Sequence, residues 1–162
     1  MINPSARPTD DIEKTMAKYA DMLYRLCCLI LKNESDAEDA VQETILKLYQ
    51  KSPSFQNEEH EKAWLIRVAT NQCRDMLRFR TRHPQIDGDQ LEKIGCEASD
   101  TGILEALSAL PEKYRIVLTL YYVQECSVED IARIICRTPS AVKMRLQKGR
   151  KLLSEKYRRE YL

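Results

Sequence analysis

The sequence lacks any apolar run long enough to cross a membrane, because no stretch approaches about 18 consecutive apolar residues. Its first residues, MINPSARPTDD, contain no apolar segment of the kind that a secretory signal peptide requires. We therefore expect no membrane insertion and a protein that stays in the cytoplasm. Strict alternation of apolar and polar residues is also missing, so no segment is typical of a half-buried β-strand.

Residues that carry catalysis or bind metals are sparse. The only two histidines, His60 and His83, lie in polar segments, with no cysteine or acid at catalytic or ligand spacing. The six cysteines form no CxxC pair, and Cys27, Cys73 and Cys136 lie among apolar residues at helical spacing. We interpret them as small core residues that stay reduced in the cytosol. The sequence thus predicts no metal site, no cofactor and no catalytic residue, and we expect no enzyme.

The net charge is only +1, which by itself argues against a nucleic-acid-binding protein. The charge is unevenly spread, however. Residues 1–80 hold 12 basic and 13 acidic residues, residues 81–110 hold 2 and 6, and residues 111–162 hold 12 and 6. The near-neutral total therefore hides a basic C-terminal third, whose local field attracts phosphates.

The segment 127–153 predicts two helices joined by a tight turn. Ser127 is placed as an N-cap, with a carboxylate three residues later as in a capping box. Thr138 followed by Pro139 restarts the chain as a second helix, because threonine caps and proline is tolerated at the first helical position. No acidic residue occurs between residues 131 and 154. This pattern is typical of a helix-turn-helix whose second helix enters a DNA major groove.

A basic amphipathic helix alone is more often a solvated face or a surface for an acidic partner. Here the second helix also has a defined inner face, since Val142, Leu146, Gly149 and Leu153 are spaced i, i+4, i+7 and i+11. Together with the capped first helix and the short turn, this spacing favours the DNA-binding interpretation.

We expect an all-α fold of two small helical domains joined by a flexible acidic linker. Residues 1–9 are expected to form a disordered arm, and residues 10–82 the first domain. The linker, residues 83–101, is rich in glycine and acid, and the second domain covers residues 102–162.

Helical periodicity predicts three helices in the first domain, at about 10–32, 35–50 and 59–82. The apolar stripe of the first includes Met16 and Tyr19. The second begins at another capping-box pattern, formed by Ser35 and Glu38. In the second domain the apolar run 121–123 could form a strand by composition, but its context is helical.

Three stretches carry a family resemblance. They are residues 36–44 (DAEDAVQET), residues 63–71 (AWLIRVATN) and the helix-turn-helix with residues 110–115 (LPEKYR) before it. In this order and spacing the chain resembles the extracytoplasmic-function (ECF) sigma factors of bacterial RNA polymerase, over about residues 19–153. The resemblance implies a sigma-2-like domain at 10–82 and a sigma-4-like domain at 102–162.

The implied activity is that of a sigma factor, which binds core RNA polymerase, recognises the minus-ten and minus-35 promoter elements, and promotes DNA melting and transcription initiation. The implied partners are core polymerase, through its β′ clamp helices and β flap, promoter DNA and an anti-sigma factor. The core-binding residues would be Asp36, Glu38, Asp39, Gln42 and Glu43. The helix dipole explains acid at the first three of these positions equally well, but not the last two residues.

The resemblance places the minus-ten contacts on the third helix and on the loop 51–60 before it. In that loop Phe55 is a candidate to hold an unstacked base. Glutamates at 58, 59 and 61 make the loop unusually acidic for the family, and we expect Trp64 to be a core residue. The full set is Phe55, Lys62, Arg67, Asn71, Arg74, Arg78 and Arg80.

The minus-35 contacts would lie on the second helix of the helix-turn-helix. Lys143 suits guanine and Gln147 suits adenine. Arg145, Arg150 and Lys151 are expected to meet phosphates, which set the register rather than the sequence. The groove-facing set is Ser140, Lys143, Met144, Gln147 and Lys148.

Two other functions fit parts of the pattern. A stand-alone helix-turn-helix repressor or activator would usually dimerise on a palindrome and would not need polymerase. A helical adaptor would bind only protein, and its interactions would survive loss of Lys143 and Lys148.

Overall fold

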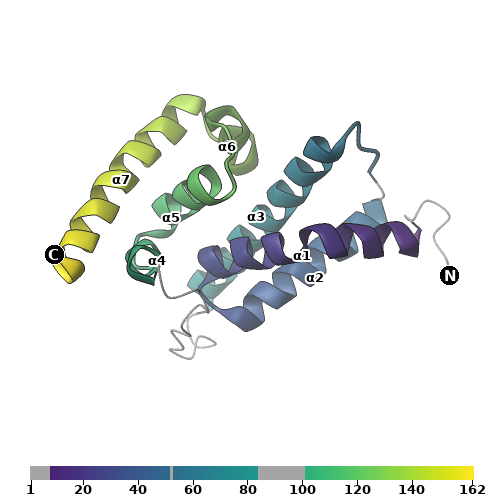
Figure 1. The fold of residues 1–162 in the computed structure, drawn as a ribbon, viewed down its shortest axis with the longest axis horizontal. Coiled ribbons are helices and arrows are strands. Elements are labelled where there is room, and N and C mark those ends of the chain that lie inside the picture. Colours follow the sequence, from purple (N-terminus) through teal and green to yellow (C-terminus); the bar gives the residue numbers. More distant parts are fainter. Residues whose placement is uncertain (1–7, 52, 84–100) are drawn as a thin grey trace. The chain divides into compact units, whose positions relative to one another are not determined.

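The computed structural model describes residues 8–51, 53–83 and 101–162, and the chain divides into two compact units, Met1–Glu92 and Lys93–Leu162. Every regular element in the described residues is helical (Figure 1), which confirms the expected all-α fold. None of these helices is both long and apolar enough to span a bilayer. The expected linker, apart from its end residues His83 and Thr101, and residues 1–7 of the expected arm lie outside the described residues.

The first unit contains three helices that pack pairwise against one another: α1 (Thr9–Leu31), α2 (Glu34–Lys51) and α3 (Glu58–Arg82) (Figure 1). Helix α1 begins one residue inside the expected arm, after Pro8 at its N-cap. All three helices contribute fully buried side chains, so the first unit has a core of its own. The largest of these are Leu23, Leu26, Ile30, Leu31, Leu48 and Leu65.

The expected inward position of Met16 was wrong, because this side chain is 40% exposed. The buried stripe at the start of α1 instead runs through Ile12, Thr15 and Tyr19. Thr15 can be buried there because its hydroxyl donates a hydrogen bond to Glu61 Oε1 at 3.0 Å. Thr15, a polar residue with a hydrogen-bond partner on another helix, is thus buried where helical periodicity predicted its apolar neighbour Met16.

The expected capping box at Ser35 was also wrong. Helix α1 ends at Lys32, whose left-handed backbone (φ 58°) turns the chain. Asn33 then caps α2, and its Oδ1 accepts a hydrogen bond from the Asp36 N–H at 2.9 Å. Asparagine is as good an N-cap as serine, and here it comes directly after the turn, so the helix starts earlier than serine would allow.

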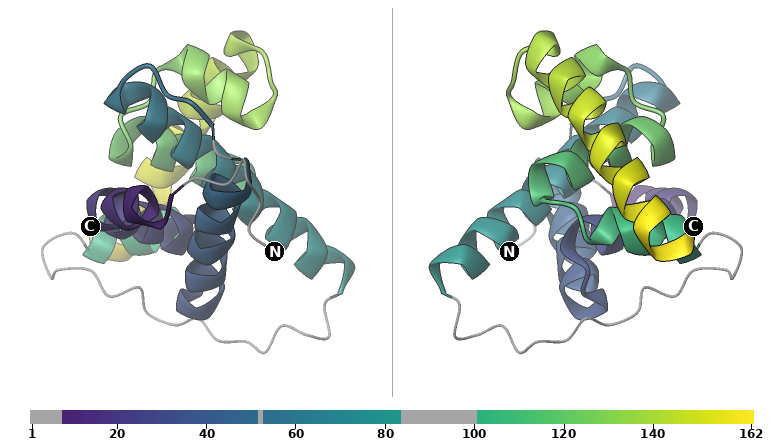
Figure 2. Two further views of the ribbon diagram at one scale, coloured as in Figure 1. Left: turned by 90° about the vertical axis from the view of Figure 1, so that its right-hand side faces the viewer. Right: turned by 90° about the vertical axis from the view of Figure 1, so that its left-hand side faces the viewer.

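The second unit contains α4 (Thr101–Ser108), α5 (Glu112–Leu118), one wide π-helical turn η2 (Thr119–Val123), α6 (Val128–Ile135) and α7 (Pro139–Tyr161). Helix α7 packs on α4, α5 and α6 (Figure 2). The run at 121–123 is therefore helical, as its context predicted. The core of this unit includes Leu118, Leu120, Ile131, Ile135 and Leu146.

Candidate nucleic-acid and protein interfaces

The α6–α7 pair has the predicted capped geometry. The Ser127 hydroxyl accepts a hydrogen bond from the Asp130 N–H at 3.1 Å, and the Thr138 hydroxyl accepts one from the Ala141 N–H at 3.2 Å. Between the helices, Cys136 adopts a left-handed backbone (φ 54°) and ends α6. Each cap contributes about 1 kcal/mol of helix stability, so both ends of the turn are fixed by local interactions.

The inner face of α7 fixes which side of the helix points outward. Val142, Leu146 and Gly149 are buried, as predicted. A Cβ atom at position 149 would stand 3.1 Å from Leu118 Cδ1 and 3.4 Å from Tyr114 Cβ. Glycine therefore lets α7 approach α5 closely, and the opposite side of α7 is held toward solvent.

That outer side collects the residues predicted to bind the minus-35 element. Met144 is 70% exposed, although it is apolar. Only Arg145 is half-buried; the others are exposed. The exposed set is Ser140, Lys143, Met144, Gln147, Lys148, Arg150 and Lys151. The structure thus presents the whole predicted contact set from one helix, with no acid among its members.

Two of the cations on α7 lie against aromatic rings. Lys148 Nζ is 5.8 Å from the centre of the Tyr114 ring, and Arg150 contacts Tyr121 and Tyr122. Burial would raise the pKa of Tyr114, but hydrogen bonds from Lys148 and Lys113 outweigh it, and the pKa is lowered. The tyrosines of the preceding helices therefore contact the charged side of α7.

In the first unit, α3 presents a row of polar and basic residues. Arg67, Asn71, Arg74 and Arg78 are spaced i, i+4, i+7 and i+11, which is one helical face. Arg74 Nη1 donates to Asn71 Oδ1 at 3.3 Å, and Arg78 pairs with Asp75 at 3.0 Å. Lys62, near the start of the helix, is half-buried and does not belong to this row, because its spacing places it on the side of the buried stripe.

The segment before α3 holds Phe55 in an aromatic cluster. Its ring lies edge-on to His60 at 5.4 Å and to Trp64 at 5.8 Å between centroids. The His60 Nδ1 accepts a hydrogen bond from the Gln56 N–H at 3.2 Å, and Asn57 caps α3. Phe55 and Trp64 are both half-buried. The expected core position of Trp64 was therefore wrong, and its ring packs against Phe55 of the loop instead.

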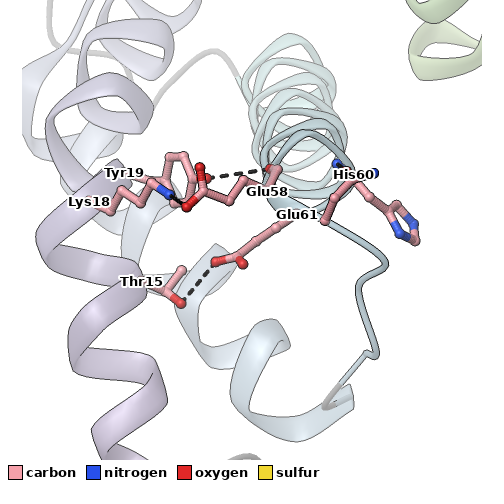
Figure 3. A network of polar contacts seen from close by, with 7 residues as sticks. Thr15, Lys18, Tyr19, Glu58, His60 and Glu61 are labelled. Carbon is pink, nitrogen blue, oxygen red and sulfur yellow. Dashed lines mark hydrogen bonds and ion pairs between the residues drawn. The ribbon is translucent and has the colours of Figure 1, made fainter.

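The acidic residues that make this region unusual face α1. Glu58 and Glu61 belong to the first turn of α3, where the helix dipole favours acid. Lys18 Nζ lies 2.5 Å from Glu58 Oε1, and Glu61 accepts the hydrogen bond from Thr15 (Figure 3). The hydrogen bond to Glu58 raises the pKa of Lys18. These two carboxylates anchor α3 to α1, while His60 points away from the network (Figure 3).

Two residues from different predicted sites form an ion pair with each other. Arg80, predicted to contact DNA, pairs with Asp36, predicted to contact polymerase. Arg80 Nη1 also donates to the Leu31 carbonyl at 3.0 Å. That carbonyl lies in the last turn of α1, which contains no basic residue of its own. Arg80 therefore supplies the positive charge that a helix C-terminus favours, and joins α3 to the α1–α2 corner.

We predict that Arg80 and Asp36 are energetically coupled. Arg80→Ala should destabilise the first unit by about 1–2 kcal/mol, because it leaves the Leu31 carbonyl without this donor and Asp36 without its partner. Asp36→Ala should lower the free energy of unfolding by a smaller amount. The loss in the double variant should fall short of the sum of the two single losses by at least about 0.5 kcal/mol. Urea unfolding followed by fluorescence measures this, because Trp64 is the only tryptophan and lies in the first unit. Strictly additive losses would contradict the pairing.

The outward face of α2 contains the other predicted core-binding residues and one that sequence reasoning missed. Glu38, Asp39 and Gln42 are exposed, and Glu43 is half-buried. Leu46 lies one turn further along this face, seven residues after Asp39, and is 44% exposed. Its helical position could have indicated that Leu46 is exposed, because it falls outside the buried stripe of α2. A single exposed leucine is common on protein surfaces, so Leu46 gains significance only from its place among the predicted core-binding residues.

The cysteines provide no site within the part of the chain that the structure describes. Cys27 and Cys73 are buried, as expected for small core residues, and Cys28 is buried too. The expected core position of Cys136 was wrong, because this residue is exposed at the C-cap of α6. A hydrogen bond between the Cys27 and Cys73 thiols, together with burial, raises the pKa of Cys73, so this thiol stays protonated. No group of three or more potential ligands among the described residues could hold a metal ion.

Two family models match the chain, and together they cover most of it. The model for sigma-70 region 2 matches residues 15–83, and the model for sigma-70 region 4 matches residues 101–153. These ranges contain all the helices described above except the first turns of α1 and the end of α7.

Curated relatives are similar over almost the full chain. The ECF RNA polymerase sigma factor SigW of Bacillus subtilis is 31% identical over 160 residues, which cover 86% of this chain and 85% of SigW. The RNA polymerase sigma factor SigV of the same organism is 32% identical over 134 residues, covering 80% and 81% of the two chains.

Two solved structures have the same fold. The sigma factor RpoE of Bartonella quintana, in complex with the anti-sigma factor NepR, has a TM-score of 0.76 at 24% identity and covers 94% of this chain and 99% of its own. CnrH, in complex with the cytosolic domain of CnrY, has a TM-score of 0.69 at 21% identity, with coverages of 94% and 91%.

Proposed function

Because the chain belongs to the sigma-70 family, as an RNA polymerase sigma factor of the ECF group that acts in transcription initiation, we propose that its two units divide the contacts of initiation between them. The first unit binds core polymerase through α2 and the minus-ten element through α3. The second unit binds the minus-35 element through α7. Each of the two promoter contacts is weak alone, and the two together bind strongly when the spacing of the promoter elements fits the linker.

The observation that carries this proposal is the separation of charge between the outward faces of two helices. The outward face of α2 offers Asp39, Gln42 and Glu43. Helix α7 offers Lys143 and Lys148, and its sequence contains no acid before residue 155. An acidic face is repelled by DNA and is suited to a basic protein surface, such as the β′ clamp helices. A cationic helix with a fixed inner face is suited to the major groove.

We assign DNA melting to the Phe55 segment and the row of polar and basic residues on α3. Phe55 is held by His60 and Trp64, so an aromatic surface is preorganised beside a basic helix. Stacking on an aromatic ring contributes about 1–3 kcal/mol per base, which offsets the unstacking of one flipped base. Arg67 and Arg78 are exposed and face phosphates in this arrangement, while Asn71 is placed to bond a base edge.

The remaining assignments follow from the family. Sigma-70 proteins regulate transcription and are not catalysts, so we propose that this chain contributes no catalytic group and that the polymerase performs the chemistry, without a cofactor from this chain. The place of action is then the cytoplasm. The β flap is the proposed contact of the second unit in the holoenzyme.

We also propose that an anti-sigma factor holds the free chain. RpoE of Bartonella quintana is bound to such a factor in its solved structure. The exposed Leu46 beside Asp39 and Glu43 offers a surface that an inhibitor would cover in competition with polymerase.

Association with purified core polymerase tests the proposal against its two alternatives. In gel filtration the chain should co-elute with core enzyme in a one-to-one complex. At physiological salt, where the weak binding of the free chain to DNA is screened, this complex should retain promoter DNA that neither component retains alone. A stand-alone helix-turn-helix regulator would instead form a dimer that binds DNA without core enzyme. An adaptor would bind protein, and Lys143→Ala with Lys148→Ala would leave all its interactions intact.

A further inference from the structure

Arg150 on α7 is held by two tyrosines from η2, the wide turn that ends α5. Its Nε donates a hydrogen bond to the Tyr122 hydroxyl at 2.5 Å. The guanidinium carbon lies 5.6 Å from the centre of the Tyr121 ring and 5.7 Å from that of Tyr122. A guanidinium at this range from a ring is attracted by the ring's electrons. Three contacts therefore restrain one long, flexible side chain.

Core packing does not explain the position of Tyr122. Its side chain is 55% exposed, and its ring lies edge-on to that of Tyr121 at 4.9 Å between centroids. The chain widens here into a π-helical turn, in which the Gln124 N–H bonds to the Thr119 carbonyl. Such turns are found frequently at functional sites. Tyr122 contacts Tyr121 and Arg150, so its position is set by these two side chains.

Arg150 lies on the charged side of α7. Lys143, Gln147 and Arg150 are spaced i, i+4 and i+7, so they share a face of the helix. Within residues 8–51, 53–83 and 101–162 no carboxylate is paired with Arg150. A guanidinium has five N–H donors, and the bond to Tyr122 uses only the one on Nε. The two terminal nitrogens remain for an anion, and their fork matches a phosphate.

We propose that Tyr122 is a positioning residue, which holds Arg150 ready for a backbone phosphate of the DNA that α7 binds. This role rests on the proposed function of α7. An unrestrained arginine loses rotamer freedom when it binds, and that loss weakens affinity. Tyr122 orders the side chain before DNA arrives, so it strengthens binding without touching DNA. From the sequence only an apolar run was recognised at this position, because the contact joins residues 28 apart in the chain.

Salt dependence separates a positioning residue from a direct contact. We would titrate the full-length chain with a fluorescein-labelled 30-base-pair duplex of mixed sequence at a series of salt concentrations. Arg150→Ala should lower the slope of log affinity against log salt by about 0.9, because one phosphate contact is lost. Tyr122→Phe removes only the hydroxyl, and should weaken binding roughly three- to tenfold while the slope stays unchanged.

A double variant and a matched control complete the test. In an Arg150→Ala background, Tyr122→Phe should have no further effect, because there is no side chain left to position. Tyr157→Phe removes a hydroxyl from the same helix as Arg150, away from these contacts, and should bind like wild type. The thermal midpoint of Tyr122→Phe should also match wild type.

Two results would overturn this role: unchanged affinity in Tyr122→Phe, or an equal loss with and without Arg150. A wild-type chain that shows no salt-dependent binding at all would instead overturn DNA binding by α7, and the role of Tyr122 with it.

Discussion

Reversing the charge of Asp39 and Glu43 to lysine is expected to abolish association with core RNA polymerase. Both residues lie on the outward face of α2. The opposite face packs through Ala40, Thr44 and Leu48, which are fully buried, so the substitutions leave the core intact. The two lysines would carry the same charge as the basic surface of the partner, and contacts between like charges cost several kcal/mol at an interface. We expect at least about a hundredfold weaker binding, since each 1.4 kcal/mol is tenfold.

The measurement is competition with a labelled wild-type chain for purified core enzyme. Glu13→Lys combined with Asp21→Lys is the matched control, because it reverses two exposed acids on α1 of the same unit. The control should compete like wild type. Equal loss in the control would mean that the total charge of the unit, and not the α2 face, determines binding, and wild-type competition by the double variant would remove α2 from the interface.

The second large effect is expected from Lys143→Ala combined with Lys148→Ala. Both side chains are exposed on α7, and neither contributes to its buried face. Each direct base contact is worth about 1–3 kcal/mol of discrimination, so the double variant should bind its promoter roughly a hundredfold more weakly or worse. Footprinting with reconstituted holoenzyme should show loss of the upstream contact, while binding to core enzyme is unchanged.

Arg158→Ala combined with Arg159→Ala provides a control of equal charge. These exposed arginines lie in the last turn of the same helix, beyond the residues that match sigma-70 region 4. Removing them should weaken binding no more than about threefold, as expected for nonspecific attraction alone. If both double variants lose promoter binding equally, α7 acts only as a diffuse positive charge and does not read sequence.

Interactions between near neighbours in the chain were predictable from the sequence. The caps at Ser127 and Thr138 reach three residues along the chain, and the inner stripe of α7 follows from helical spacing. Local chemistry decides such features, so residue types at fixed offsets predict them well. The failure at Ser35 occurred where a second capping residue, Asn33, stood two positions earlier.

Pairings between distant residues were not predictable in the same way. Arg80 bonds to Leu31, 49 residues away, and Thr15 bonds to Glu61, 46 residues away. Neither bond has a sequence signature, and the first holds Arg80, a predicted DNA contact, at the α1–α2 corner. The acids at Glu58 and Glu61 suggested an unusual loop, yet their partners are on α1. Residue type indicates that a charge needs a partner, but only the packing of helices decides which partner it finds.

Transcription from purified components tests the central claim most directly. Core polymerase freed of other sigma factors would be mixed with this chain and genomic DNA fragments, and the 5′ ends of the transcripts would be mapped. The account predicts discrete start sites that appear only when the chain is added and vanish with the α2 charge reversal. Random starts, or none, on every template in the presence of a folded chain would contradict it.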